Sequence, residues 1–486
     1  MVDTKVVETS SSSPLHVVVF PWLAFGHMIP FLELSKRLAQ HGLAVTFVST
    51  PRNAARLGAV PPELSAHIRI AKLELPVVEG LPEGAESTAD VSQEKVELLK
   101  KAFDGLAVPF TNLVANHDCS AAIGGDVPAG FSRKPDWIIL DFAHSWVWPI
   151  AEEHKIACAM LLIYPVAMMA FAGPKHENEA HPRTTTEDYM VPPPWIPFPS
   201  TLAYRRHGAE WMAGAFRPNA SGVSDADRFW QVHRPSCRLV IHRSCPEAEP
   251  RLFELTTELF AKPVMPAGLL LPDDVVDDED APVNGVASHD QPFLSTMQWL
   301  DAQPRRSVLY VALGSEAPVT AAHVRELARG LELSGVRFLW ALRRPAGLLP
   351  DDGFEARVAG CGVVRGGWVP QVRVLAHAAV GAFLTHCGWG STVEGLFRFG
   401  HPLVMLPFIV DQGLVARAMA ERGVGVEVPR NDDGSFSGED VAAAVRQVME
   451  GEALARNARE LQKVVGDRVR QEQYIDELVE NLQRYK

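Results

Sequence analysis

The sequence predicts an α/β protein made of two doubly wound halves, each with a parallel sheet between helices. The chain has 486 residues, more than a single hydrophobic core usually supports. Short β-branched runs alternate with helical patterns from residue 15, and this alternation starts again after residue 291. The acidic stretch between the two series indicates where one half ends and the next begins.

The first half opens in the order strand, turn, helix, strand. Residues 15–20 (LHVVVF) form a β-branched run typical of a buried parallel strand. A glycine-bearing turn leads into a helical pattern that ends at Gly42, and a second strand is predicted at 44–49. This order is a βαβ unit, which builds parallel sheets. Further strands are expected at 68–73, 137–141, 157–163 and 239–243, and a helix at about 92–116.

The second half repeats the alternation. A strand at 307–313 precedes a helix at about 320–334. Ser437 and Asp440 resemble the two ends of a capping box that opens a later helix. The other strands are expected at 337–342, 380–386, 403–407 and 424–428.

Two stretches interrupt these patterns. The proline-rich run 190–199 cannot continue a helix or a central strand, so it predicts a long connection of the kind that often carries substrate contacts. The acidic run near residue 280 is more often a solvated linker than a site. We expect a disordered tail at 1–14, a Rossmann-like domain at 15–270, a linker at 271–291, a second Rossmann-like domain at 292–463, and a helical segment at 464–486 that packs back on the first domain.

Charge, cysteine content and hydrophobic runs exclude several classes of function. A net charge of −13 argues against a nucleic-acid partner, which requires clustered Lys and Arg. The six cysteines include no CxxC pair, a pattern that suits reduced thiols. The N-terminus lacks the apolar core of a signal peptide, and no run approaches the length of a membrane helix. We expect a monomeric cytoplasmic enzyme without a membrane span, and peripheral association with a membrane stays open.

The stretch 368–412 carries the strongest functional signal. It reads as strand, tight glycine turn, helix start, proline-bounded strand and a closing polar pair. Backbone N–H groups at a helix start attract phosphate, and His386, Ser391 and the glycines around them would present such donors. Trp368 offers a flat face for a base, and Glu394 can accept hydrogen bonds from ribose. The stretch predicts a site for a nucleotide diphosphate.

Two polar residues follow predicted strands of the first half. His27 comes after Gly26 at the carboxyl end of the first strand, where open α/β sheets place ligands. An imidazole with a near-neutral pKa can remove a proton from an alcohol. Asp141 ends another strand, and a carboxylate bonded to imidazole orients it and stabilises its charged form. A histidine or an aspartate in such a position is more often structural than catalytic. The catalytic interpretation of this pair therefore depends on the nucleotide site predicted at 368–412.

Several segments resemble plant family-1 glycosyltransferases, which use UDP-sugars. They are PWLAFGH (21–27), STPRN (49–53), LPEGAEST (81–88), DWIILD (136–141), VALGS (311–315) and the stretch 368–412. The resemblance spans residues 15 to 485, nearly the whole chain. It implies the GT-B fold, in which two facing Rossmann-like domains enclose a cleft. The first domain would bind the acceptor, and the second would bind the UDP-sugar.

The resemblance also implies roles for single residues. His27 would be the general base, with Asp141 as its partner. The donor site would comprise Trp368 on uracil; Gln371 and Glu394 on ribose; Ser315, His386 and Ser391 on the diphosphate; Asp411 and Gln412 on the sugar; and Val369, Gly388, Trp389 and Gly390. The acceptor would contact Phe25, Gly26, Glu86 and His144.

The segments PWLAFGH, LPEGAEST and LELSGVRFLWAL look most like the branch-forming subgroup, which adds a sugar to one already attached to a terpenoid (steviol-type) or flavonoid. This implies inverting transfer, with glucose as the main donor sugar and rhamnose or xylose as alternatives. No HExxH or grouped Cys/His pattern occurs, and this absence together with the resemblance leads us to expect no metal. One rival function is an NAD-dependent oxidoreductase, although the first βα turn lacks GxGxxG. The other rival is a non-catalytic UDP-sugar-binding homologue.

The chain departs from the family pattern at two places. Gly390 stands where the family usually has Asn, and a lost hydrogen bond to a charged group is worth about 1.5–3 kcal/mol, which predicts weaker donor binding. One extra residue lies within 396–399. Inside a helix it would rotate Asp411 and Gln412 away from their expected places, unless the loop before Pro402 absorbs it.

Several assignments have a structural alternative. Trp389 is as consistent with packing under the helix start as with ligand binding, and Cys387 is expected to be a small buried side chain rather than a nucleophile. Asp411 and Gln412 would also serve as a helix N-cap. A cluster of aromatic residues is expected in the core or as a loop anchor rather than as an acceptor wall: Trp195, Phe198, Trp211 and Phe216.

Overall fold

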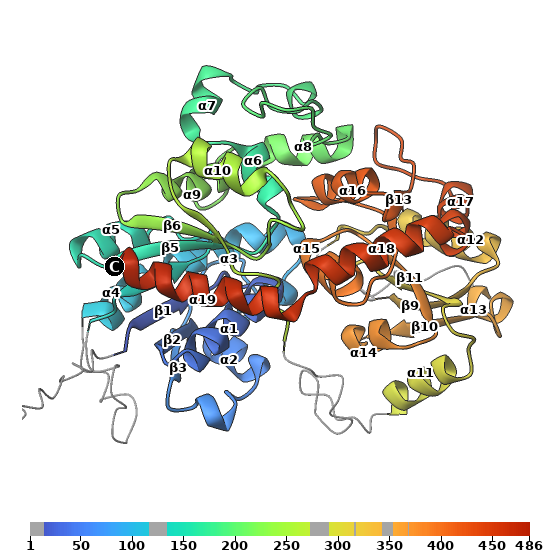
Figure 1. Ribbon diagram of the computed structural model, residues 1–486, viewed down its shortest axis with the longest axis horizontal. Helices are drawn as coiled ribbons and strands as arrows, with labels where there is room; N and C mark the ends of the chain where they lie inside the picture. Colours follow the sequence, from blue (N-terminus) through green and yellow to red (C-terminus); the bar gives the residue numbers. More distant parts are fainter. Residues whose placement is uncertain (1–13, 116–133, 273–290, 315–316, 343–352, 368) are drawn as a thin grey trace, which may run out of the picture.

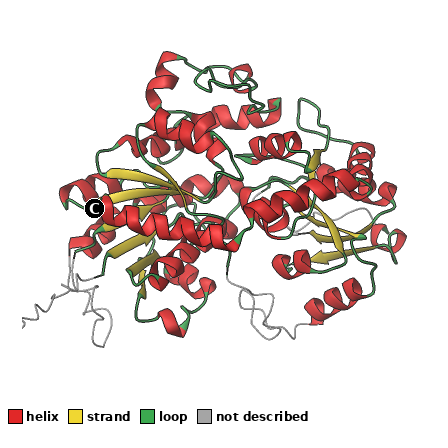
Figure 2. Cartoon of the chain, in the orientation of Figure 1, coloured by secondary structure: helices red, strands yellow, loops and turns green. Residues whose placement is uncertain are grey.

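The molecule contains two parallel sheets that lie side by side, each with helices packed around it (Figure 1). This computed structural model describes residues 14–115, 134–272, 291–314, 317–342, 353–367 and 369–486. Figure 2 shows the strands at the centre of each half, surrounded by helices and loops. The predicted class, an α/β protein with two Rossmann-like halves, is therefore confirmed.

The N-terminal sheet is formed by β1 (His16–Phe20), β2 (Ala44–Ser49), β3 (Ile68–Lys72), β4 (Trp137–Leu140), β5 (Ala157–Leu162), β6 (Cys237–His242) and β7 (Val264–Pro266). The spatial order is β3-β2-β1-β4-β5-β6-β7, and every pairing is parallel. The order reverses between β1 and β4, where Phe20 pairs with Leu140. Open α/β sheets bind ligands at the carboxyl ends of strands at such a reversal.

The C-terminal sheet is formed by β8 (Val308–Ala312), β9 (Arg337–Leu342), β10 (Gly362–Gly366), β11 (Val380–Thr385), β12 (Leu403–Met405) and β13 (Gly425–Glu427). Its order is β10-β9-β8-β11-β12-β13, again parallel throughout. Here the order reverses between β8 and β11, where Ala312 pairs with Thr385. Each half thus has one switch point at which a ligand site is expected.

The helices around the N-terminal sheet are α1 (Phe25–Gln40), α2 (Pro51–Leu57), α3 (Val96–Asp104), α4 (Ala107–Ala115), α5 (Val147–Glu153), α6 (Val166–Ala172), α7 (Lys175–Ala180), α8 (Arg206–Ala215), α9 (Asp225–Phe229) and α10 (Leu252–Phe260). The helical pattern expected at about 92–116 is confirmed, although it is not one continuous helix. It is divided at Gly105, where an added Cβ would lie 2.5 Å from the Pro76 side chain. The absence of a side chain at Gly105 allows this close packing at the junction between α3 and α4.

The helices of the C-terminal half are α11 (Gln291–Asp301), α12 (Ala321–Ser334), α13 (Phe354–Arg357), α14 (Gln371–Ala376), α15 (Trp389–Thr392), the π-helix η7 (Val393–Arg398), α16 (Gln412–Glu421), α17 (Gly438–Met449), α18 (Glu452–Val465) and α19 (Arg468–Arg484). The start of α17 matches its sequence signal. The Ser437 hydroxyl accepts a hydrogen bond from the Asp440 N–H at 3.2 Å, which satisfies one of the open donors of the first turn.

The last helix returns to the N-terminal half. Whereas α18 packs on η7, α19 lies beside α1 (Figure 1). Leu478 and Leu482 join the core below β1 and β4, and the Trp137 indole donates to the Leu482 carbonyl at 2.8 Å. The C-terminal helices therefore connect the two halves a second time.

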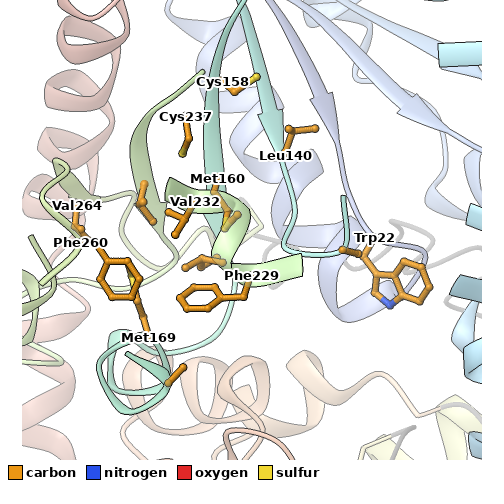
Figure 3. Close-up of a cluster of buried hydrophobic side chains, with 14 of the residues drawn as sticks. Trp22, Leu140, Cys158, Met160, Met169, Phe229, Val232, Cys237, Phe260 and Val264 are labelled. Carbon is orange, nitrogen blue, oxygen red and sulfur yellow. The ribbon is translucent and has the colours of Figure 1, made fainter. Parts of the chain in front are cut away.

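Alternate residues of each central strand enter different cores. On β4, Ile138 and Leu140 face one core, while Trp137 and Ile139 face the other. Figure 3 shows part of the first of these cores, with Leu140 and Met160 on neighbouring strands and Phe229 and Phe260 packed nearby. Among the described residues, no helix has both the length and the apolar character needed to cross a bilayer.

The aromatic residues of the proline-rich connection are anchors of the fold. Trp195 is buried, and its indole donates to the Ala170 carbonyl at 2.8 Å. The Arg183 guanidinium lies over the rings of Trp195 and Phe216, at 4.8 and 5.4 Å from their centroids, an arrangement that favours cation–π attraction. Phe198 and Trp211 pack against the same core. The structural alternative predicted for these four aromatic residues is thus the one observed.

Candidate active site

The candidate base lies at the switch point of the N-terminal sheet. His27 is in the first turn of α1, directly after β1, and Asp141 directly follows β4. His27 Nδ1 and Asp141 Oδ2 are 2.7 Å apart. The His27 side chain is 17% exposed, whereas Asp141 is only 1% exposed. A buried carboxylate thus orients an imidazole that faces outward, an arrangement suited to taking a proton from a bound hydroxyl.

Backbone donors hold the Asp141 carboxylate in place. Its Oδ2 accepts from the Trp22 N–H at 3.0 Å, and its Oδ1 accepts from the Phe142 N–H at 2.7 Å. Because Trp22 follows β1 and Phe142 follows β4, the sheet itself fixes the carboxylate. Hydrogen bonds of this kind stabilise the charged form and meet part of the cost of burying it.

His386 occupies the switch point of the second sheet, directly after β11. Two glycines leave space for its ring: an added Cβ on Gly314 or Gly388 would lie 2.7 or 2.5 Å from ring atoms. Burial lowers the pKa of His386 to about 4, so the imidazole is neutral at physiological pH. Its Nδ1 is buried without a hydrogen-bond partner among the described residues. An enclosed polar atom of this kind is typical of a site that a ligand completes.

The helix after His386 contains most of the stretch 396–399, where the sequence predicts one extra residue. Cys387 has a φ of +65°, a left-handed conformation that is strained for a residue with a Cβ. From Gly388 the chain enters α15 and then the π-helix η7, whose wider turn accommodates one more residue than an α-helical turn. The next strand pairs regularly, Leu403 with Phe383 and with Gly425. The insertion therefore ends before β12 and does not change that strand's register.

Gln371 and Glu394, predicted to hold ribose, are in contact. The Gln371 side-chain amide donates to Glu394 Oε2 at 2.7 Å, and burial raises the pKa of Glu394. Val369 is half-buried and packs on the core behind them. Ser315 and Trp368, the residues predicted to bind the diphosphate and uracil, lie outside the described residues.

Trp389 has a structural role. It is buried against Phe397, and its indole N–H donates to the Arg243 carbonyl at 2.6 Å. Since Arg243 follows β6, this hydrogen bond joins the two halves. Cys387 is a buried free thiol whose pKa burial raises well above its usual value, as expected for a packing residue.

Asp411 and Gln412 lie at the start of α16. The Gln412 side-chain oxygen accepts from the N–H groups of Phe408 and Ile409 at 2.8 and 3.0 Å, so it fixes the preceding loop. Asp411 stands at the N-cap position, but its side chain makes no capping hydrogen bond. The capping alternative is therefore wrong for its carboxylate. Burial raises the pKa of Asp411 to about 7, and the nearby charge of His27 opposes this shift, so the two side chains interact across the domains.

The residues expected at the acceptor are divided between surface and core. Phe25 and Gly26 open α1 beside His27, and Gly26 is exposed. Glu86 is partly buried, and its carboxylate accepts from the Arg52 N–H at 2.8 Å. His144, by contrast, is fully buried against Phe20 and Phe103.

His144 therefore lies inside the protein core, beneath the surface at which the acceptor is expected to bind. Burial lowers the pKa of His144 to about 4, and its Nδ1 is 3.1 Å from the Asp141 carbonyl. The expectation that it contacts the acceptor is not supported by this geometry, because no part of its side chain reaches the surface. A histidine in the loop after a strand can point into the core or toward the surface. Here it points into the core and packs against the rings of Phe20 and Phe103.

One charged side chain near the site was missed in the sequence. Arg243 follows β6 at the carboxyl edge of the first sheet, and it is only 5% exposed. Its Nη1 lies 3.5 Å from where a Cβ on Gly390 would stand. Its place at the end of the strand predicted at 239–243 was the available signal. Among the described residues, no group of three or more His, Cys, Asp or Glu side chains is arranged to hold a metal ion.

Comparisons with known proteins agree with this arrangement. Residues 272–472 match the model of the family described as UDP-glucoronosyl and UDP-glucosyl transferase. UDP-glycosyltransferase 91C1 of Arabidopsis thaliana is 40% identical over 469 residues, 96% of each chain. The soyasaponin III rhamnosyltransferase of Glycine max is 36% identical over 488 residues, 98% of this chain and 97% of that protein.

Solved structures show the same fold. UGT73P12 of Glycyrrhiza uralensis, crystallised with glycyrrhetinic acid 3-O-monoglucuronide, superposes with a TM-score of 0.79 at 22% identity and covers 97% of this chain and 96% of that one. Its fold supports GT-B for this chain. With the relatives matched over almost their whole length, the conclusion is that this chain belongs to the plant family-1 UDP-glycosyltransferases and is a UDP-sugar-dependent transferase.

Proposed function

We propose that the enzyme transfers glucose, or rhamnose, from a UDP-sugar to a hydroxyl of a small-molecule glycoside, with inversion at the anomeric carbon and without a metal. The observation that carries this proposal is the His27–Asp141 pair at 2.7 Å, with the His27 charge near enough to Asp411 of the other domain to oppose the rise of its pKa. A base and a sugar-binding carboxylate from opposite domains thus face the same space. A transfer between two bound substrates requires this arrangement.

In the proposed step, the acceptor hydroxyl loses its proton to the Nε2 of His27, because Nδ1 is engaged by Asp141. The acceptor oxygen forms a bond to the anomeric carbon as the bond from that carbon to the UDP oxygen breaks. The bonding electrons leave with UDP. Asp141 stabilises the imidazolium that results, as a carboxylate does in a catalytic triad.

The C-terminal domain would hold the donor. Gln371 and Glu394 would hold ribose, a role supported by their contact, in which the Gln371 amide donates to one Glu394 carboxylate oxygen. His386 and Ser391 lie at the turn into α15, where backbone N–H groups and a neutral imidazole would stabilise the charge that develops on the diphosphate. Asp411 would bind sugar hydroxyls. The Gln412 amide N–H₂ group would help, since its oxygen already accepts from the backbone.

The acceptor class rests on the relatives and on the acceptor side of the site. The soybean relative is named for a rhamnosyl transfer to a saponin, and the segments around Phe25, Gly26 and Glu86 are those that resemble the branch-forming subgroup. We therefore propose a terpenoid or flavonoid glycoside as acceptor, with the new sugar added to the existing one. A cytoplasmic location belongs to the same proposal, supported by the free thiols of the described cysteines.

A direct test combines UDP-glucose, UDP-rhamnose and UDP-xylose in turn with a panel of monoglycosides and their aglycones, and identifies products by mass spectrometry. The proposal predicts diglycosides from the monoglycosides and little product from the aglycones. Proton coupling constants at the new anomeric centre would establish inversion. Equal use of aglycones would contradict the branch-forming assignment, and retention of configuration would contradict the single displacement.

A further inference from the structure

Arg243 is a buried cation whose terminal nitrogens have no partner among the described residues. Its Nε donates to the Leu269 carbonyl at 2.8 Å, and its backbone N–H donates to the Leu162 carbonyl at 2.9 Å. Only 5% of the residue is exposed. Burial of an arginine is costly unless its donors are satisfied, so two open nitrogens in this position indicate that something else binds them.

The guanidinium is held against the start of α15. The Trp389 indole donates to the Arg243 carbonyl at 2.6 Å, which fixes this backbone against the second domain. Arg243 Nη1 lies 3.5 Å from the position of a Cβ on Gly390, in ordinary van der Waals contact. The space beside Gly390, which a longer side chain would fill, is therefore occupied by a guanidinium from the opposite domain.

No carboxylate neutralises this cation directly, since the ion pairs of the described residues do not include Arg243. Burial lowers its pKa to about 10, while the charges of Glu394 and Glu33 oppose that shift. The group stays protonated at physiological pH. A protonated guanidinium group that has no ion-pair partner, and that lies next to the turn into α15, is suited to binding a phosphate group.

We propose that Arg243 binds the diphosphate of the UDP-sugar through its terminal nitrogens, in the place of the missing side chain at position 390. This inference rests on the proposed donor site. The donor is then bound by both domains: the second supplies Gln371, Glu394 and the turn at His386, and the first supplies the cation. The weaker donor binding expected from Gly390 is offset, because the Arg243 donors replace the lost amide.

The test is the affinity of the full-length protein for UDP and for uridine, measured by isothermal titration calorimetry. Arg243→Met keeps an unbranched apolar stem but removes the guanidinium group and its charge. It is expected to weaken UDP binding by roughly 10- to 100-fold, the size of a hydrogen bond to a charged group, and to leave uridine binding unchanged. Arg243→Lys keeps the positive charge but not the two terminal guanidinium nitrogens. It should lower the affinity for UDP by a smaller factor and leave the affinity for uridine unchanged.

Arg422→Met is the matched control. Arg422 is also partly buried at the domain interface, where it donates to the Glu247 carbonyl at 3.1 Å. It should leave both affinities unchanged. If it weakens UDP binding as much as Arg243→Met, the loss reflects domain packing and the proposal fails. The proposal also fails if Arg243→Met and Arg243→Lys bind UDP like the wild type, or lose UDP and uridine equally. Failure of the wild type itself to bind UDP would instead contradict the proposed donor site.

Discussion

At the scale of single residues, the backbone decides which side chains can do chemistry. Asp141 is buried, yet it accepts hydrogen bonds from Trp22 and Phe142 in addition to its contact with His27. Those donors come from the two strands of the switch point, so the sheet that places the base also orients it. His386 shows the opposite case, in which burial keeps an imidazole neutral beside a predicted anion site.

The Asp141→Asn variant tests this orientation. The amide keeps the size of the side chain but cannot stabilise an imidazolium, so kcat should fall at least about 100-fold, the range of a general-base contribution. The affinity for UDP should stay the same, because Asp141 contacts His27 and is not among the groups proposed to bind UDP. Steady-state kinetics and calorimetry measure the two quantities, and an unchanged kcat would contradict the role of Asp141.

A second residue-scale prediction concerns pH and Asp411. Burial raises its pKa to about 7 in the folded state, above the usual 3.8 of an unfolded chain. Between these values the folded state holds a proton that the unfolded state has lost, so stability from this group is present below pH 4 and is lost as the pH rises through 7. Asp411→Asn should therefore raise the melting temperature of the ligand-free protein at pH 8 more than at pH 5. If the increase in melting temperature caused by Asp411→Asn is the same at pH 5 and pH 8, or is larger at pH 5, the raised pKa of Asp411 is contradicted.

The sequence indicated some of these residues and not others for a physical reason. His27, Asp141 and His386 each follow a β-branched run, and the carboxyl ends of parallel strands meet at one edge. Arg243 also follows such a run, but its partner Gly390 lies in the other domain, and no local pattern reports a contact between domains. His144 has a sequence position like that of an acceptor-binding residue, but its ring packs in the aromatic core.

At the scale of elements, most strands were predictable, whereas β7 and β10, each at one edge of its sheet, were not. β7 has three residues and β10 begins and ends with glycine, so neither carries the hydrophobic pattern that reveals a strand. The extra residue within 396–399 was expected to threaten Asp411 and Gln412. Instead, η7 widens the helix by one residue, and β12 resumes in register.

The C-terminal helix offers a test at this scale. Leu478 is fully buried between α19 and the N-terminal sheet, whereas Glu480 on the same helix is exposed. Leu478→Ala should lower the free energy of unfolding by about 2–5 kcal/mol, through lost burial and the cavity that remains. Glu480→Ala should have little effect. Chemical denaturation measures both, and equal effects would show that α19 is not part of the core.

At the scale of the whole molecule, contacts between the halves bring the two switch points together. The Tyr204 hydroxyl donates to the Val410 carbonyl at 2.8 Å, next to Asp411. Arg205 pairs with Glu427 at 2.6 Å, and the Trp389 indole reaches the Arg243 carbonyl. With α19, these contacts hold the proposed base of one domain opposite the proposed donor site of the other. The central claim, that catalysis requires both domains at once, follows from this geometry.

The most direct test of that claim is a single comparison of His27→Ala with the wild type, in which turnover of UDP-sugar with a glycoside acceptor and binding of UDP are measured on the same preparations. The account predicts that turnover is nearly eliminated while UDP affinity is retained, because His27 acts on the acceptor hydroxyl and is not among the groups proposed to bind UDP. Wild-type turnover in a purified His27→Ala enzyme, or loss of UDP binding together with activity, would contradict it.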